Sequence, residues 1–393
     1  MDFELTREQV MIRDNVREFM DKEIGPVCQQ MDEEDRFPED LFPQMGSLGY
    51  LGLSLPVEYG GEGLEFFASI LAAEQMGRVS PAVGLSYCAH ANLCAHNIAR
   101  NGNEEQKRKF LPGLCAGTLV GCMGLTEPGA GSDAVGISTT AVKDGKHYLL
   151  NGSKTFITNA PIADVALVYA KTSPEKKSRG ITAFLVEKGT PGFSVSRRIE
   201  KIGHHGSPTG ELVFMDARVP EENVLGRVDQ GVRVMMNGLD SERIIVAALC
   251  LGIGLAALEL ALSYSRKREQ FGRPICEFQL TKAKLADMYT ENEAARGLIY
   301  RAASLAEKSG EGGKGTELHK LAAAAILYTA EATSRATANS VQIHGGYGYT
   351  TEYPINRFYR DSKLYEIGAG TSEVRRLLIA DELIRRGIGG RQA

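Results

Sequence analysis

A glutamate interrupts an otherwise apolar stripe of a long predicted helix. The stripe repeats at the alternating spacing of four and three residues that one helix face requires, and consists of Met235, Leu239, Glu242, Val246, Leu249 and Ile253. Apolar surroundings disfavour a carboxylate anion, so the pKa of Glu242 should rise towards the range of a general base. Arg243 points about 100° away around the helix and is no obvious partner. The pattern leaves two interpretations open: a catalytic base, or a glutamate that reaches solvent or a distant arginine.

Two further segments have the composition of ligand-binding loops. In residues 126–133 (TEPGAGSD), small residues after a proline allow a backbone to approach a ligand closely and to present N–H groups to an anion. Neither a P-loop nor a dinucleotide fingerprint fits, and an ordinary tight loop is the alternative. In residues 151–159 (NGSKTFITN), Asn151 and Gly152 predict a hairpin turn. The strand after this turn ends with Phe156 among hydroxyl and amide side chains. Such a strand end could hold a flat heteroaromatic cofactor, or the strand could simply face solvent.

Two basic or glycine-rich segments lie nearer the C-terminus. Basic residues at 266–268 suit the negative end of a helix dipole. The arginines, Gln270 and Phe271 would also suit a pyrophosphate and an adenine. In residues 342–349 (QIHGGYGY), His344 alone would most often be structural. The crowded glycines indicate a close backbone turn, as a cofactor contact or a subunit junction requires.

The elements that must position these motifs change type twice along the chain. A helical period runs through the first 115 or so residues. Short β-branched and aromatic runs separated by turn residues then follow from about 119 to 219, without alternating helices. From residue 231 the pattern is helical again, with breaks at 309–315 and 344–354. We therefore expect an α+β fold: an N-terminal helical domain (1–118), a central antiparallel β domain (119–230) and a C-terminal helical bundle (231–393).

Composition excludes several classes of protein. The 393 residues are 43% apolar and 24% charged with a net charge of −4, which is typical of a soluble globular protein and argues against nucleic acid as the main partner. The apolar stretch 244–262 contains glycines and Glu259, and predicts a buried core helix and no membrane span. The N-terminus lacks secretory or mitochondrial signals, so we expect a cytoplasmic protein, or a mature matrix form. Seven cysteines without a C-x-x-C pair predict buried free thiols and no metal site.

Five segments together resemble the acyl-CoA dehydrogenase family over essentially the whole chain. They are residues 126–133, 151–159, 268–272 (REQFG), 342–349 and 370–373 (GTSE). The resemblance implies the family fold, a homotetramer with one FAD per subunit, and α,β-dehydrogenation of an acyl-CoA with electrons passed to electron-transfer flavoprotein. In that chemistry a carboxylate removes the α-proton while the β-hydride passes to flavin N5.

The resemblance also assigns site residues. Those implied to contact FAD within the subunit are Met123, Leu125, Thr126, Gly131, Ser132, Phe156, Ile157, Thr158, Thr371, Ser372 and Glu373. Those implied to contact FAD from a neighbouring subunit are Arg268, Gln279, Gln342, His344, Gly345 and Gly346, and Phe271 is also assigned to the cofactor. Those implied to contact the acyl-CoA are Ser132, Ser178, Arg179, Arg233, Asp240, Arg243, Ala369 and Gly370. Phe156 replaces the tryptophan of most members, which keeps a flat wall but loses an indole N–H.

The position of the base narrows the resemblance to a subgroup. Most members carry the base immediately before the Gly-Thr of the C-terminal motif, where this chain has Ala369. A smaller subgroup that includes isovaleryl-CoA dehydrogenase carries it on the long helix, and residues 89–94, 239–243 and 365–376 are similar to that subgroup. The resemblance therefore assigns the base to Glu242. Gly368 and Ala369 leave space that favours a short branched or cyclic acyl group.

Alternative functions stay open at this point. His204, His205 and Arg233 depart from the subgroup, and their cationic character could suit an acyl chain that bears its own carboxylate, or could be surface variation. An oxygen-using acyl-CoA oxidase or flavin monooxygenase would share the fold. A non-catalytic flavin protein that binds nucleic acid would be expected to carry an extra basic C-terminal region, and the net charge of −4 argues against this class.

Overall fold

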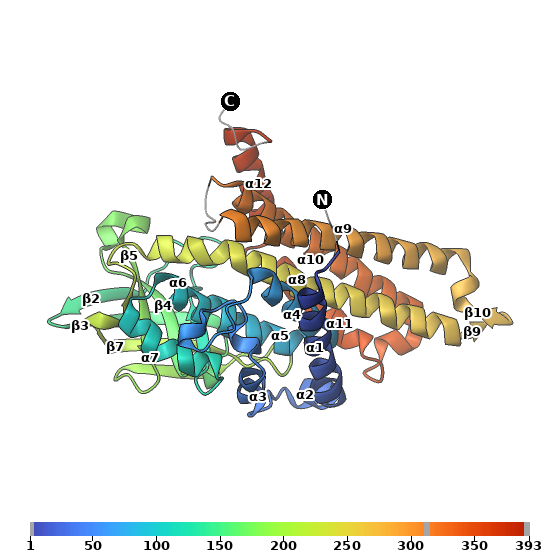
Figure 1. The fold of residues 1–393 in the computed structure, drawn as a ribbon, viewed down its shortest axis with the longest axis horizontal. Coiled ribbons are helices and arrows are strands. Elements are labelled where there is room, and N and C mark those ends of the chain that lie inside the picture. The colour runs from blue at the N-terminus through green and yellow to red at the C-terminus, as the bar shows by residue number, and fades with distance from the viewer. Residues whose placement is uncertain (1–3, 310–314, 389–393) are drawn as a thin grey trace.

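The computed structural model describes residues 4–309 and 315–388, and shows a sheet at one end of an elongated body with long helices running to the other (Figure 1). The N-terminal helices are α1 (Arg7–Phe19), α2 (Cys28–Glu34), α3 (Leu41–Ser47), α4 (Phe66–Val79), α5 (Pro81–Tyr87), α6 (His96–Asn101) and α7 (Glu104–Cys115). Asn103 caps α7 by accepting from Gln106 N at 2.8 Å, while the Gln106 side chain accepts from Asn103 N in return. Local polar signals therefore determine where this helix begins.

The central part is one mixed sheet. Its strands are β1 (Gly121–Gly124), β2 (Thr140–Asp144), β3 (His147–Thr158), β4 (Val165–Lys171), β5 (Ile181–Glu187), β6 (Phe193–Arg198), β7 (Thr209–Pro220) and β8 (Val224–Leu225). The order is β6-β7-β3-β2-β4-β5-β8, with β1 beside β4. Pairing is antiparallel except where β1 and β2 lie parallel to β4. Alternate residues of β4 enter two different cores, because successive side chains of a strand point to opposite faces.

The predicted hairpin at Asn151 and Gly152 is wrong. Both residues lie inside the continuous strand β3, and the turn comes earlier, between Asp144 and His147. β3 pairs with β7 on both sides of a register shift between Leu150 and Gly152, and the amide of Asn151 hydrogen-bonds Asp216. The left-handed φ of Gly152 (142°) thus serves a bulge. The long ladder with β7 overrides the local turn preference.

The C-terminal part is a helical bundle. Its elements are α8 (Gly231–Lys267), β9 (Glu269–Gln270), β10 (Arg273–Pro274), α9 (Gln279–Ser309), α10 (Glu317–His344), α11 (Ile355–Ser362) and α12 (Ser372–Arg386). Of the predicted break at 309–315, residues 310–314 lie outside the described part of the chain. Among the described residues, α8 alone has the length and apolar composition of a membrane span, and most of that stretch is buried inside the protein. The expected core helix is confirmed, since Leu249 and Ile253 are fully buried.

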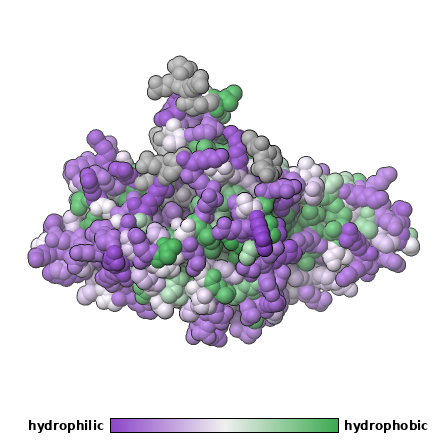
Figure 2. All heavy atoms as spheres, viewed as in Figure 1, coloured by the Kyte–Doolittle hydropathy of each residue, from purple (hydrophilic) through white to green (hydrophobic). Residues whose placement is uncertain are grey.

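The surface polarity and the state of the cysteines are those expected from the amino-acid composition. Hydrophilic side chains cover most of the face shown in Figure 2, with apolar residues in scattered groups. All seven cysteines are free; six are buried and Cys276 is half-buried, as predicted.

Candidate functional site

Glu242 lies in the interior, between the core of the helical bundle and the core beneath the sheet. Met235, earlier on the α8 stripe, belongs to the sheet core, and Val246 belongs to the bundle core. The Glu242 side chain is 8% exposed, and its Oε2 has no hydrogen-bond partner among the described residues. Burial raises the pKa of Glu242 to about 7, although the positive charges of Arg243 and Arg375 act to lower it. A carboxylate with this pKa and an unused oxygen is suited to accept a proton near neutral pH.

Arg243 follows Glu242 in sequence but pairs elsewhere. Its Nη1 donates to Asp240 Oδ1 at 3.0 Å, and the same oxygen lies 2.8 Å from Nδ1 of His319 on α10. Asp240 and Arg243, both expected to contact the acyl-CoA, are thus buried in contacts that tie α8 to α10. The positive charge of Arg243 acts to lower the pKa of Glu242 without a hydrogen bond between the two side chains. His319 had no sequence signal, since nothing in its spacing pointed to α8.

A second buried arginine, Arg375, fixes the backbone on the N-terminal side of Ala369. Arg375 of α12 donates from Nη1 to Tyr365 O at 2.8 Å and from Nη2 to Gly368 O. Between these carbonyls and α12, Ala369 and Gly370 adopt left-handed φ angles of 54° and 87°. Thr371 then caps α12 by accepting from Val374 N, with Ser372 buried and Glu373 exposed. The motif was recognised from sequence, but the role of Arg375 in holding it was not.

The structure brings the two loop motifs of the sheet together. Thr155 N donates to Thr126 O at 2.9 Å, so the segment before Gly131 runs beside the end of β3. Phe156 is 67% exposed and has a left-handed φ of 60°, whereas Ile157 beyond it is buried and Thr158 is half-buried. A Cβ added at Gly131 would meet nothing within 4 Å. An aromatic ring held in the open beside an uncrowded glycine loop fits a flat cofactor such as FAD. Met123 and Leu125 are half-buried, and Ser132 is exposed.

The other predicted cofactor residues lie at the far end of the molecule. The short strands β9 and β10 lie at the end of the bundle opposite the sheet (Figure 1). Arg268 comes directly before β9, Phe271 lies in the turn between the two strands, and Gln279 begins α9. Phe271 is 94% exposed with a left-handed φ of 54°. Near it in the fold, His344 ends α10 and stacks on Tyr264 at 4.4 Å. One chain therefore does not bring these residues together with Phe156.

Gln342, Gly345 and Gly346 complete this second group at the end of α10. Gln342, Gly345 and Gly346 are all exposed, and a Cβ added at Gly345 or Gly346 would meet nothing within 4 Å. Burial lowers the pKa of His344, whose Nδ1 lies 2.7 Å from Ser340 O. The glycines leave the backbone open to an approaching molecule, while the histidine is held by its own helix.

Exposed cationic groups lie near the sheet end of α8. Arg179 and Arg233 are both exposed, and Ser178 is half-buried. The carboxylate of Asp229 ties the two segments by accepting from Thr172 at 2.6 Å and from Ser173 at 3.0 Å. These arginines are accessible to an anionic group in solution, in contrast to Arg243.

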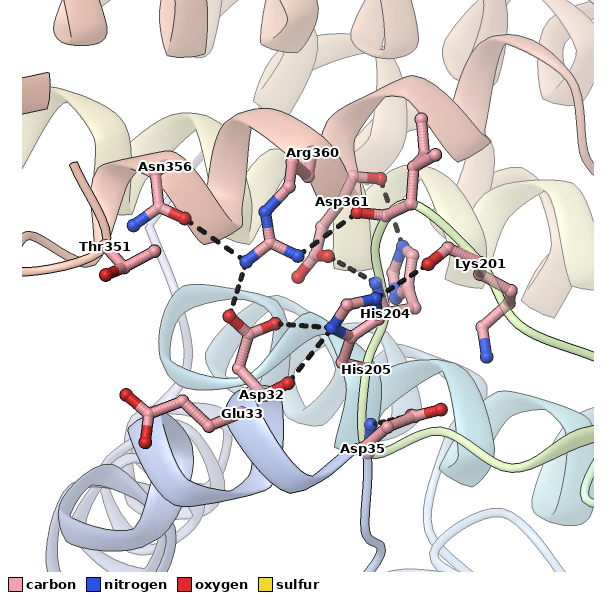
Figure 3. Close-up of polar contacts among 12 residues, drawn as sticks. Asp32, Glu33, Asp35, Lys201, His204, His205, Thr351, Asn356, Arg360 and Asp361 are labelled. Atoms are coloured by element: carbon pink, nitrogen blue, oxygen red, sulfur yellow. Dashed lines mark hydrogen bonds and ion pairs between the residues drawn. The ribbon is translucent and has the colours of Figure 1, made fainter. Parts of the chain in front are cut away.

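His204 and His205 belong to a polar cluster that joins α2, the loop before β7 and α11 (Figure 3). The ring nitrogens of His205 lie 3.0 Å from Asp32 O and 2.7 Å from Lys201 O. Arg360 donates to the Asp32 carboxylate and, at 3.1 Å, to Ile202 O. The cluster therefore connects the N-terminal, central and C-terminal parts of the chain.

His204 is fixed more deeply in the same cluster. Its backbone N–H donates to the Asp361 carboxylate, its Nε2 lies 3.0 Å from Asp361 O, and its ring meets Tyr365 edge-on at 5.4 Å. Burial lowers the pKa of His204. His204 is thus buried, and both ring nitrogens of His205 contact backbone carbonyls, so neither ring faces an open site where a substrate carboxylate could bind.

Similarity to known proteins extends over nearly the whole chain. Three family profiles match: the N-terminal domain of acyl-CoA dehydrogenase over residues 6–118, its middle domain over 122–217 and its C-terminal domain over 229–384. A mitochondrial isovaleryl-CoA dehydrogenase of Pongo abelii is 46% identical over 379 residues, which is 95% of this chain and 88% of that protein.

Solved structures give the same result. Butyryl-CoA dehydrogenase from Megasphaera elsdenii superimposes with a TM-score of 0.94 at 42% identity, over 98% of this chain and 100% of that one. An acyl-CoA dehydrogenase complexed with FAD from Bacillus anthracis superimposes with a TM-score of 0.90 at 35% identity, over 98% of this chain and 68% of that one.

Proposed function

The chain belongs to the acyl-CoA dehydrogenase family of FAD-dependent oxidoreductases, and on that premise we propose that it converts a short branched or cyclic acyl-CoA to the 2-enoyl-CoA with Glu242 as the base. The observation that carries this proposal is that Oε2 of the buried Glu242 has no hydrogen-bond partner among the described residues. The other position at which family members carry the base is Ala369 in this chain, and alanine cannot accept a proton. The similarity to isovaleryl-CoA dehydrogenase supports a branched acyl group.

We assign each step of this reaction to residues of the chain. Glu242 Oε2 takes the α-proton, and its raised pKa keeps it basic enough to do so near neutral pH. Thr126, Phe156 and Thr371 lie on the segments that would hold FAD, which when bound supplies the acceptor for the β-hydrogen and its electron pair. Arg375 holds the backbone next to Ala369, a residue that would contact the acyl group in this proposal. Arg179 and Arg233, which are both exposed, would bind the phosphates of CoA.

We further propose that the site is completed by a second copy of the chain in a homotetramer. β9, β10 and the start of α9 lie at the opposite end of the molecule from the sheet (Figure 1), so the residues beside them, Arg268, Phe271 and Gln279, cannot join Phe156 within one chain. Phe271, Leu280 and Tyr349 are large, highly exposed residues at that end, as expected of a contact surface. Electron-transfer flavoprotein is the proposed electron acceptor, and the cytoplasm the proposed compartment.

Anaerobic titration with a panel of acyl-CoAs tests the substrate. We expect isovaleryl-CoA to bleach the flavin absorption band at the lowest concentration, butyryl-CoA less readily and glutaryl-CoA least, because His204 is buried and both ring nitrogens of His205 contact backbone carbonyls. Bleaching by glutaryl-CoA alone would replace the proposed substrate with a carboxylated one. Rapid reoxidation by oxygen with release of hydrogen peroxide would identify an oxidase.

The pKa of Glu242 predicts the pH dependence of flavin reduction. Only the ionised carboxylate accepts a proton, and burial raises its pKa to about 7. We therefore expect the second-order rate constant to rise about tenfold per pH unit below pH 7 and to level off above it. Stopped-flow measurements at constant ionic strength check this. A rate constant that stays level far below pH 7 would show that another group is the base.

A further inference from the structure

A buried ion pair joins the two segments proposed to line FAD. Lys154 of β3 and Glu127 of the 126–133 loop lie 2.7 Å apart, Nζ to Oε1, with side chains 0% and 2% exposed. Neither was assigned a role from the sequence. Lys154 is two residues before Phe156, and Glu127 directly follows Thr126. The pair therefore lies where a small displacement would move both segments.

Glu127 is held as an anion by several donors. Its Oε1 also accepts from Thr139 N at 3.0 Å, and its Oε2 accepts from the backbone N–H and, at 2.7 Å, the hydroxyl of Ser138. Burial alone would raise the pKa of Glu127, but the hydrogen bonds from Lys154, Thr139 and Ser138 lower it to about 2. This carboxylate is a fixed counter-charge and has no free oxygen for catalysis.

Lys154 makes a second contact that determines the direction of a peptide. Its Nζ also donates to Leu125 O at 3.3 Å. In a trans peptide the C=O and the following N–H point in opposite directions, so the Thr126 N–H points away from Lys154. The next carbonyl, Thr126 O, is held by Thr155 N. The Thr126 N–H itself donates to no residue in the part of the chain that the structure describes.

Stability alone does not account for this pair. A buried ion pair is typically no more stabilising than a well-packed apolar pair of similar volume. An apolar pair, however, could not hold the Leu125 carbonyl. We propose that Lys154, with Glu127 as its counterion, is a positioning residue that presents the Thr126 N–H to FAD as a preorganised donor. This inference rests on the proposed placing of FAD beside Thr126 and Phe156, and is independent of Glu242 and of the acyl group.

The test is the charge-neutral double variant Lys154→Met with Glu127→Gln, which keeps side-chain volume. Titration of the apoprotein with FAD, without acyl-CoA, should show a dissociation constant raised about tenfold, the loss expected for one well-oriented hydrogen bond. The midpoint potential of bound FAD should become more negative, because an N–H donor stabilises the electron-rich reduced ring. A role confined to folding would leave this potential unchanged.

The matched control is the double variant Lys143→Met with Glu221→Gln, which removes an exposed ion pair between β2 and the turn after β7. It should bind FAD as the wild type does. Wild-type affinity and potential in the Lys154 variant would overturn the proposal. If that variant does not fold, hydrogen exchange at the Thr126 N–H of the wild type decides. FAD should slow it at least tenfold, and unchanged exchange would refute the contact.

Discussion

Glu242→Gln should give a folded protein that binds FAD and acyl-CoA but whose flavin its substrate no longer reduces. Glutamine keeps the shape of the side chain, and its amide does not accept a proton near neutral pH. Glu242 Oε2 has no hydrogen-bond partner among the described residues, so the substitution breaks no contact of that atom. We expect flavin reduction to slow by about 10⁴-fold, the upper range for loss of a general base. Stopped-flow absorbance under anaerobic conditions measures the rate.

The control is Glu259→Gln on the same helix. Glu259 is half exposed and pairs with Arg78 at 2.8 Å on the outside of the bundle. Its replacement should leave the rate of flavin reduction near that of the wild type. If Glu242→Gln reduced its flavin as fast as Glu259→Gln does, the base would have to be another residue.

Arg375→Met should have the second-largest effect, on stability and on activity together. The substitution leaves the carbonyls of Tyr365 and Gly368 without their donor in a buried site. We expect the free energy of unfolding to fall by about 2–4 kcal/mol. Ala369 and Gly370 would lose the restraint on their left-handed backbone, and flavin reduction should slow as well. Urea denaturation and stopped-flow reduction on the same preparation measure both effects.

The neighbouring arginine provides a matched comparison. Arg376 is exposed and pairs with Glu331 at 2.6 Å on the surface. Arg376→Met should therefore change the free energy of unfolding by no more than about 1 kcal/mol. Equal losses in the two variants would mean that Arg375 does not hold the loop.

Local patterns in the sequence were sufficient to predict the order of the helical and β regions along the chain. The change from helical to strand periodicity near residue 119, and back near 231, agrees with α7, the sheet and α8. The cap of α7 by Asn103 is also a local feature, because capping depends on residues three positions apart. The stripe of α8 identified Glu242 as a buried carboxylate, because helix geometry alone places it among apolar neighbours. The motifs identified the family, since each is a continuous run of residues.

Contacts between distant segments were decided by the tertiary structure alone. Asn151 and Gly152 have the composition of a turn, yet pairing with β7 keeps them in a strand. Arg375 and Lys154 looked like ordinary charges, because their partners are backbone carbonyls or a residue on another segment.

Contacts between distant segments also decided the roles of the two histidines, His204 and His205, and of Glu242. His204 and His205 could be interpreted as substrate-binding cations until Asp361 and Asp32 were found beside them. For Glu242, the sequence gives the residue type and the helix face. Only the packing of α8 between two cores, with Arg243 turned towards Asp240, leaves its oxygen unpaired and raises its pKa. Periodicity determines which side of an element faces inwards, whereas the fold determines what that side meets there.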